Sequence, residues 1–261
     1  PETVQVSAAG KIQMHPLLRA LPRPLLDALV RAKERVEGIP GVGDVDFGDL
    51  RRVTPFSRDF GYCRGQPVDR IYIERFLKQN ASDIRGSVIE IGEDTYTRRY
   101  GGDRVTHNDV LHVSDDNPAA TIVGDLAEAP GIAGASYDAL ILTQTLHLIF
   151  DLHGAVRTMH RIIKPGGVIL VTVPGITRVP SGKDWGDTWF WSFTARALQQ
   201  LFVPYFGAGA VTTASHGNVL VATSFLYGLS AADLTEEQLG HSDPEYPVTV
   251  TLRAVKRAEA E

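Results

Sequence analysis

Hydrophobic positions in the second two thirds of the chain form short, nearly continuous runs separated by amphipathic stretches. A run such as "VILVTV" (residues 168–173) is typical of a parallel strand, because helices cover both faces of a parallel sheet. Stretches with apolar residues three and four positions apart indicate helices. We predict seven strands, at Ser87–Ile91, Val105–Leu111, Thr121–Val123, Asp138–Thr143, Val168–Val173, Ala210–Thr213 and Val248–Val255.

Helical patterns lie between these strands. The clearest is "DLHGAVRTMHRII" (151–163), which the turn sequence "KPGG" follows; Thr194–Phe202 and residues 218–229 are two more. Strands that alternate with helices predict an α/β fold: a Rossmann-like, doubly wound, mostly parallel seven-stranded sheet. Ligands of such sheets bind beyond the carboxyl ends of the strands, so the residues that follow each strand are the candidates for function.

The first 69 residues have a different character. Residues 15–38 begin with prolines and continue as a leucine-spaced helical stretch, and residues 39–50 are rich in glycine. A loop then leads into a second helical pattern that ends near Asn80 or Gly86. We therefore expect residues 1–69 to form a helical and loop extension, as a lid or a substrate wall, and residues 70–261 to form the main domain.

Composition narrows the classes of partner. With 261 residues, 43% of them hydrophobic and 22% charged, the chain is long enough and apolar enough to fold. Its net charge of -5 argues against nucleic acid, whose phosphates select basic surfaces. No apolar run reaches the length of a membrane span, and the N-terminus lacks a signal pattern, so we expect a cytoplasmic protein with no membrane partner. The sequence does not determine whether the protein forms an oligomer.

Metal and disulfide chemistry receive little support. Cys63 is the only cysteine, so it can form no disulfide within the chain and no thiolate metal site. The His, Asp and Glu residues show no convincing metal-ligand spacing either. We therefore expect no metal site.

Acidic residues follow or end three successive predicted strands: Glu90, Asp109 and Asp125. The loop after the first strand has a single glycine, Gly92, where a dinucleotide-binding loop carries three. Carboxylates in this loop, Glu93 among them, would repel a pyrophosphate. S-adenosylmethionine (SAM) has no phosphate and carries a positive sulfonium, and carboxylates can accept hydrogen bonds from its ribose. The strand ends therefore favour SAM over NAD.

The motifs in this region resemble those of a known family. "VIEIGEDTYTRRYGG", "THNDVLHV", "ATIVGDL", "YDALILTQTLHLI" and "HRIIKPGGVILVTVPG" are similar to the successive motifs of class I SAM-dependent methyltransferases. The resemblance covers about residues 68–173, although in the family's E/D-x-G-x-G-x-G motif only Gly92 matches a glycine. "WGDTWFWSFTARALQQLF" resembles a segment of the bacterial members often encoded beside glycosyltransferases.

This resemblance implies a role for each matching residue. Glu90 and Gly92 would flank the methionine and ribose of SAM. Asp109 would accept hydrogen bonds from the ribose hydroxyls, with Asp115 and Asp116 as alternatives for that role. Asp125 would accept a hydrogen bond from the adenine amino group, Leu126 would pack on the adenine ring, and Gln144 would face the reactive end of SAM. Two of these acids have a simpler interpretation, because Asp109 is able to cap a turn and Asp125 a helix.

Further candidates surround the transferred methyl group. His147 is a candidate base for a hydroxyl acceptor, or else a buried histidine at a helix start. An arginine before the first strand is expected to pair with the cofactor's carboxylate, and Arg64 and Tyr72 are the candidates there, together with Tyr62 and Arg70. Trp185, Trp189 and Asp187 are expected to bind substrate, or the aromatic rings simply pack a helix onto the sheet.

The sequence thus predicts a SAM-dependent methyltransferase of a small molecule or glycan, acting most readily at oxygen. Three alternatives remain: an N-methyltransferase of the same fold, an NAD-dependent oxidoreductase, and a binding module that keeps the fold without turnover.

Overall fold

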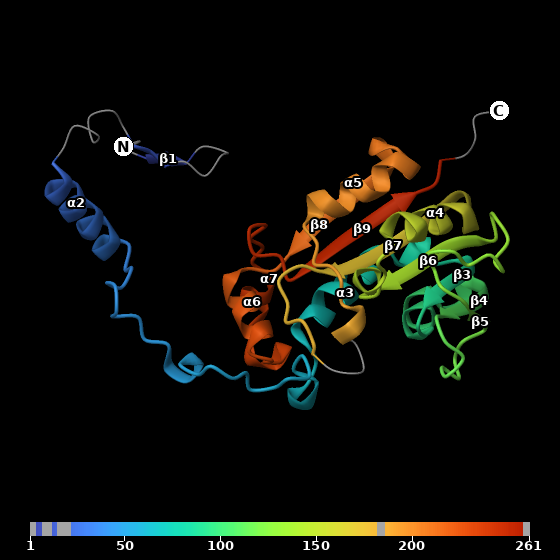
Figure 1. Ribbon diagram of the computed structural model, residues 1–261, viewed down its shortest axis with the longest axis horizontal. Helices are drawn as coiled ribbons and strands as arrows, with labels where there is room; N and C mark the ends of the chain where they lie inside the picture. The colour runs from blue at the N-terminus through green and yellow to red at the C-terminus, as the bar shows by residue number, and fades with distance from the viewer. Residues whose placement is uncertain (1–3, 7–11, 15–21, 182–185, 258–261) are drawn as a thin grey trace. The chain divides into compact units, whose positions relative to one another are not determined.

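The computed structural model describes residues 4–6, 12–14, 22–181 and 186–257 (Figure 1). The chain divides into two compact units, Pro1–Val53 and Thr54–Glu261. Residues 54–69, which the sequence grouped with the N-terminal extension, fall in the larger unit. No helix in the described part of the chain is long and apolar enough to cross a membrane.

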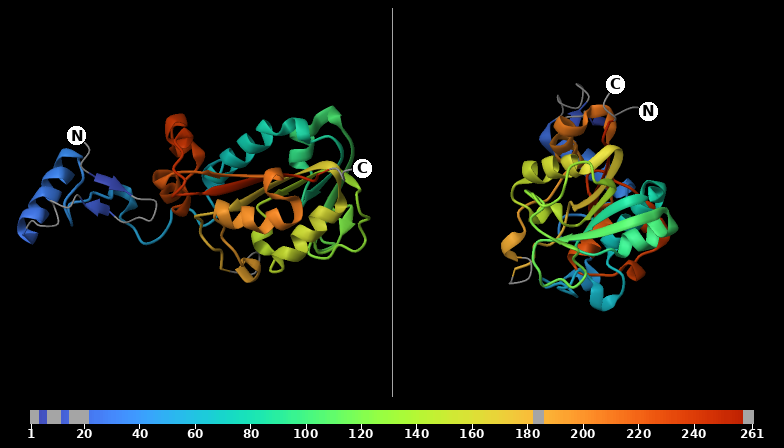
Figure 2. Two further views of the ribbon diagram at one scale, coloured as in Figure 1. Left: turned by 90° about the horizontal axis from the view of Figure 1, so that it is seen from above. Right: turned by 90° about the vertical axis from the view of Figure 1, so that its right-hand side faces the viewer.

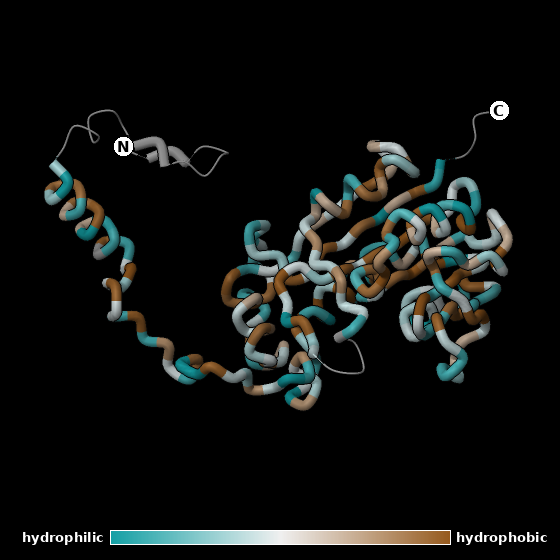
Figure 3. The backbone as a smooth tube through the Cα atoms, viewed as in Figure 1, coloured by the Kyte–Doolittle hydropathy of each residue, from teal (hydrophilic) through white to brown (hydrophobic). Residues whose placement is uncertain are grey.

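The smaller unit contains one long helix. Strands β1 (Val4–Val6) and β2 (Ile12–Met14) pair antiparallel, and helix α2 spans Arg23–Val36, which confirms the predicted leucine-spaced helix. Figure 3 shows hydrophobic and hydrophilic positions alternating along this helix. Leu25, Leu29 and Val30 are each about half exposed, so these apolar side chains have no buried environment within the described part of the unit.

The larger unit is built on the predicted sheet of seven strands. The strands are β3 (Gly86–Ile91), β4 (Val105–His112), β5 (Ile122–Val123), β6 (Tyr137–Thr143), β7 (Ile163–Pro174), β8 (Val211–His216) and β9 (Thr249–Val255). Their order across the sheet is β5-β4-β3-β6-β7-β9-β8. The first five in this order are mutually parallel, and β9 runs antiparallel to both β7 and β8. The prediction of a doubly wound, mostly parallel sheet is confirmed.

Helices cover both faces of this sheet, as Figure 2 shows from above. Helices α4 (Leu152–Ile162) and α5 (Ala195–Phe206) pack on one face, where Met159, Ile162, Leu198 and Phe202 are buried against strand residues. Helix α3 (Val68–Gln79) packs on the other face through Ile73, Phe76 and Leu77. Helices α6 (Val219–Leu226) and α7 (Glu236–Gly240) extend the α3 layer.

The connections at the β4 side are unusually short. After β3 the chain makes only a π-helical turn, Thr97–Gly101, and a turn of 3-10 helix, Gly102–Arg104, before β4, and it passes from β4 to β5 without a helix. At the carboxyl ends of β6 and β7 the sheet instead meets α3, α6 and several long loops. The two sides of the same sheet edge therefore offer different surroundings to a ligand.

Candidate active site

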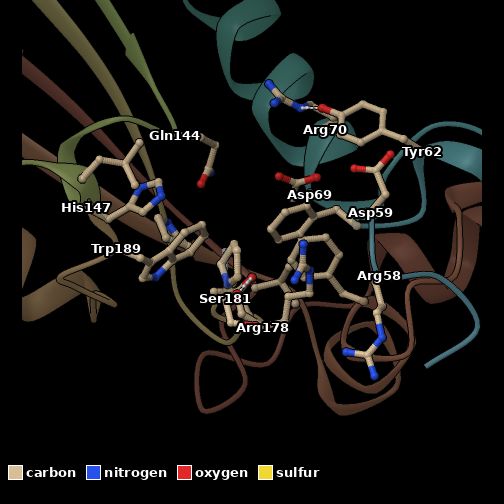
Figure 4. Close-up of a pocket in the computed structure, with 17 residues that line it drawn as sticks. Arg58, Asp59, Tyr62, Asp69, Arg70, Gln144, His147, Arg178, Ser181 and Trp189 are labelled. Carbon is tan, nitrogen blue, oxygen red and sulfur yellow. Dashed lines mark hydrogen bonds between the residues drawn. The ribbon is translucent and has the colours of Figure 1, made fainter. Parts of the chain in front are cut away.

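A cavity of about 500 Å³ lies beyond the carboxyl ends of β6 and β7 (Figure 4). Its lining comes from four parts of the larger unit: residues 58–62, the first turn of α3, the segments that follow β6 and β7, and Trp189. Phe225 of α6 and Val248 complete it. This is the edge of an open α/β sheet at which ligands bind.

Polar atoms without partners gather in this cavity. Among the described residues, eight buried side-chain nitrogen or oxygen atoms have no hydrogen-bond partner, and five of these belong to residues that line the cavity. The five are Asp69 Oδ1, Gln144 Nε2, His147 Nδ1, Arg178 Nε and Trp189 Nε1. Folded proteins leave few buried polar groups unpaired, so such a concentration indicates a site whose hydrogen bonds are completed by a ligand.

Helix α3 brings one acidic and one basic side chain to the same side of the cavity. Its first turn follows Pro67, whose fixed φ suits a helix start, and carries Asp69 and Arg70 next to each other. Arg70 donates hydrogen bonds to the hydroxyls of Tyr62 (3.1 Å) and Tyr96 (3.2 Å), which fix its guanidinium. Burial raises the pKa of Asp69, so its carboxylate would gain from a cationic partner.

The segment after β6 supplies two further polar groups. Gln144 has a φ of 46°, a conformation that costs energy for any residue other than glycine, and its backbone N–H is held by the Thr172 carbonyl at 2.9 Å. His147 is only 2% exposed, and burial lowers its pKa to about 3. The imidazole is therefore neutral near pH 7 and leaves Nδ1 free within the cavity.

Stacked side chains form one side of the cavity. The rings of His147 and Trp189 lie 4.1 Å apart, Trp189 stacks on Phe60 at 6.2 Å, and the Arg178 guanidinium carbon lies 4.2 Å from the centre of the Phe60 ring. Below, this set of four side chains is called the Trp189 stack. The backbone carbonyl of His147 also accepts hydrogen bonds from Phe190 and Trp191, which anchors the Trp189 segment to the end of β6.

The structure places Glu90 in a structural position. It is 1% exposed and its carboxylate accepts hydrogen bonds from the backbone N–H groups of Tyr96 and Thr97 and from the Thr97 hydroxyl. Burial raises its pKa to about 7 in spite of these bonds. Both oxygens are thus engaged with the π-helical turn after β3, and Glu90 does not line the cavity beyond β6 and β7.

Asp109 does not lie at a strand tip. It lies three residues before the end of β4, and its carboxylate accepts hydrogen bonds from Thr121 (2.7 Å), Tyr137 (2.7 Å) and His107 (2.8 Å). Burial works against the charged form of Asp109, but these hydrogen bonds outweigh it and lower the pKa. The ribose role expected for Asp109 therefore lacks a geometric basis, because the donors of the fold itself occupy both oxygens. Asp115 and Asp116 lie beyond the strand end.

Gly92, Asp125 and Leu126 do lie where strands end. Gly92 has a φ of 94°, which favours glycine, and a Cβ there would meet open space. Asp125 is exposed; its Oδ1 accepts from the backbone N–H of Ala127 in a turn rather than in the helix cap expected as its simpler role, and Oδ2 has no partner among the described residues. Leu126 is 4% exposed and packs in the core.

The remaining predicted residues are dispersed. Arg64 pairs with Asp233 at 2.9 Å, and the Tyr72 hydroxyl donates to the Leu239 carbonyl; neither side chain lines the cavity. Asp187 is exposed and does not line the cavity either. Trp185 lies outside the described residues. Of the predicted set, Gln144, His147 and Trp189 are brought together.

Sequence reasoning missed Asp69, Phe60 and Arg178. Asp69 is adjacent to a residue that we had considered, Arg70, and Phe60 lies in the same segment. Arg178 follows β7 within "PGITRVP", so the rule that ligands contact the residues after each strand would have found it had the segment been read further. The described residues contain no cluster of three His, Cys, Asp or Glu side chains that could hold a metal ion.

Comparison with known proteins agrees with this architecture. Residues 93–171, from the loop after β3 into β7, match the family model described as a methyltransferase domain. A protein of Mycolicibacterium smegmatis named as a probable S-adenosylmethionine-dependent methyltransferase is 26% identical over 147 residues, which are 56% of this chain and 52% of that protein. The chain thus spans about half the length of this relative. The expectation of a methyltransferase domain is supported.

Solved structures include similar chains at low sequence identity. An S-adenosylmethionine-dependent methyltransferase from Mesorhizobium loti is 14% identical with a TM-score of 0.49, over 72% of this chain and 100% of that one. A SAM-dependent methyltransferase from Archaeoglobus fulgidus is also 14% identical, with a TM-score of 0.46, over 77% of this chain and 95% of that one.

Proposed function

We propose that this chain is a SAM-dependent methyltransferase that modifies an oxygen atom of a small molecule or glycan. The observation that carries the proposal is the cavity beyond β6 and β7, in which Asp69 and Arg70 lie next to each other and five buried polar atoms lack partners. The match of residues 93–171 to a methyltransferase domain supports it independently.

The residues present fit the amino-acid end of SAM. That end carries an α-ammonium and an α-carboxylate, and the cavity offers the free Asp69 Oδ1 for the first and the Arg70 guanidinium for the second. Arg70 is held by two tyrosine hydroxyls, so little side-chain freedom would be lost when it binds a carboxylate. We assign the adenosine end to the tips of β3 and β5, at Gly92 and Asp125.

Methyl transfer from SAM depends mainly on the alignment of the acceptor atom with the methyl group. SAM, when bound, supplies a methyl group on a sulfonium, which is already a good leaving group. The protein must hold the acceptor in line with that methyl group and keep water away from it. The apolar side chains of Pro174, Phe225 and Trp189 in the lining serve the exclusion of water, and Gln144 offers a donor to orient either partner.

His147 is suited to hold a hydroxyl rather than to remove its proton in the ligand-free cavity. Its neutral ring presents Nδ1 without a partner, which is able to accept a hydrogen bond from an acceptor O–H. A pKa near 3 makes it a weak base, because a useful general base has a pKa near the working pH. We therefore propose that His147 orients the hydroxyl of the methyl acceptor.

Calorimetric titration tests the proposal. We expect the protein to bind S-adenosylhomocysteine but not NAD, and Asp69→Asn to weaken that binding by about 10- to 100-fold, the worth of a charged hydrogen bond. Asp103→Asn, an exposed acid on the short turn before β4, is the matched control and should change nothing. Binding of NAD alone would contradict the proposal. Transfer of labelled methyl groups to paired hydroxyl and amine acceptors then separates O- from N-methylation.

A further inference from the structure

Arg178 is the charged member of the Trp189 stack. It lies in the segment after β7, and its guanidinium carbon is 4.2 Å from the centre of the Phe60 ring. Phe60, Trp189 and His147 continue the stack from there to the end of β6. A planar guanidinium that lies on an aromatic face keeps its N–H edge available for a ligand.

This arginine has no counter-ion within the described part of the chain. No carboxylate there lies within ion-pair distance of it, and its Nε is buried without a hydrogen bond. Burial lowers the pKa of Arg178; the charge of Asp59 only partly offsets this effect, and the charge of Arg58 adds to it. A half-buried cation of this kind is stabilised when an anion binds to it.

Two further free atoms on this side of the cavity are also donors. Trp189 Nε1 and Gln144 Nε2 are able only to donate, like Arg178 Nε, and all three are buried and without partners. A ligand that satisfies them must be rich in acceptor oxygens. Figure 4 shows Arg178 and Trp189 on the side of the cavity away from the Arg70–Tyr62 pair.

Arg70 and Arg178 therefore differ in their surroundings. Arg70 already contacts two tyrosines and adjoins Asp69, an arrangement that suits a group carrying both charges. Arg178 adjoins aromatic rings and no acid within ion-pair distance among the described residues, an arrangement that suits an anion attached to a ring or another apolar body.

We infer that the methyl acceptor is an acidic small molecule, whose carboxylate or phosphate binds Arg178 and the Trp189 indole N–H while its hydroxyl faces His147. This inference rests on the proposed function, because it assigns the Asp69–Arg70 side of the cavity to the methyl donor. It narrows the acceptor class to anionic compounds such as acidic sugars or aromatic acids.

Binding of small ring compounds tests it. Benzoate, phenyl phosphate and the neutral isostere benzamide are titrated into protein saturated with S-adenosylhomocysteine, and into protein without it. We expect at least one anion to bind about tenfold more tightly than benzamide, in line with a charge-assisted hydrogen bond. Which of the two anions binds better distinguishes a carboxylate from a phosphate.

Variants of Arg178 identify the residue responsible. Arg178→Gln should reduce the preference for the anion to less than about threefold, and Arg178→Lys should restore part of it, because lysine keeps the charge without the planar fork. Arg196→Gln, an exposed arginine on α5, is the control and should leave the preference intact. S-adenosylhomocysteine should bind all four proteins equally.

Three outcomes would overturn the inference: benzamide binds as tightly as the anions, no probe binds, or Arg178→Gln keeps the full preference. Failure of S-adenosylhomocysteine to bind is a different result. It would contradict the proposed function, while an anion preference that persisted without it would still identify Arg178 as an anion site.

Discussion

Two regions at the same edge of the sheet differ in how their polar groups are used. At β3 and β4, Glu90 and Asp109 accept hydrogen bonds from the π-helical turn, Thr121, Tyr137 and His107. At β6 and β7, Asp69, His147 and the neighbouring donors have buried atoms without partners. Two of the three acids that stand out in the sequence, Glu90 and Asp109, are thus held by the fold, whereas most of the buried polar atoms without partners among the described residues belong to the cavity beyond β6 and β7.

This difference between the two regions predicts which substitutions affect the stability of the fold and which affect ligand binding. A buried carboxylate with complete hydrogen bonding holds its own segment in place, and its removal leaves donors unpaired. A buried polar atom with no partner lowers the stability of the free protein, and this lost stability is recovered when a ligand forms the missing hydrogen bond. Substitutions at β3 and β4 should therefore change unfolding, and substitutions in the cavity should change binding.

The largest expected effects concern the pH dependence of stability, and Glu90 provides the first of them. Because burial raises its pKa from its ordinary value near 4.5 to about 7, the folded state binds the proton more tightly than the unfolded state. The free energy of unfolding should then fall between about pH 4.5 and pH 7, by up to about 3 kcal/mol from this group. Glu90→Gln should remove this decline in urea unfolding measured across the range.

The pH dependence of stability expected from His147 has the opposite sign to that expected from Glu90. The pKa of His147 is lowered to about 3, so its contribution to stability is lost as the pH falls from about 6.5 toward 3. His147→Gln should remove that acid-side loss and leave the Glu90 decline in place. If Glu90→Gln left the profile parallel to that of the unsubstituted protein, Glu90 would not be buried as the structure shows.

A smaller effect is expected at Asp109. Asp109→Asn should lower the free energy of unfolding by about 2 kcal/mol, because an amide cannot accept from all three of its donors. The affinity for S-adenosylhomocysteine should stay the same. Tyr137→Phe, which removes one of these bonds, serves as a milder control. A large loss of affinity with unchanged stability would return Asp109 to the ribose role.

The smallest stability effect is expected at Asp125, which keeps one carboxylate oxygen free among the described residues. Asp125→Ala removes a turn hydrogen bond to Ala127 and should cost less than about 1 kcal/mol of stability. If Asp125 accepts the adenine amino group, the affinity for S-adenosylhomocysteine should fall by about tenfold. Equal affinity in calorimetry would place the adenine elsewhere.

Much of the fold was predictable because strand patterns are local. The run "VILVTV" is typical of a strand buried on both faces, and the structure confirms it as the second half of β7, which lies between β6 and β9. Gln144 and His147 were also found, since they follow a strand that the pattern locates well. Asp109 lies inside the predicted strand as well as inside β4, and its hydrogen bonds from Thr121 and Tyr137 could not be predicted from a local pattern, because both partners are remote in the sequence.

The sequence by itself determined the alternation of strands and helices, and with it the edge of the sheet at which a ligand would bind. Hydrophobic periodicity carries that information because each residue's burial follows from its own position in a helix or strand. Only the tertiary structure decided which polar groups remain free there. Whether Asp109 is satisfied depends on Tyr137, and whether Arg178 is unpaired depends on residues far from it in the chain, so no local pattern records either fact.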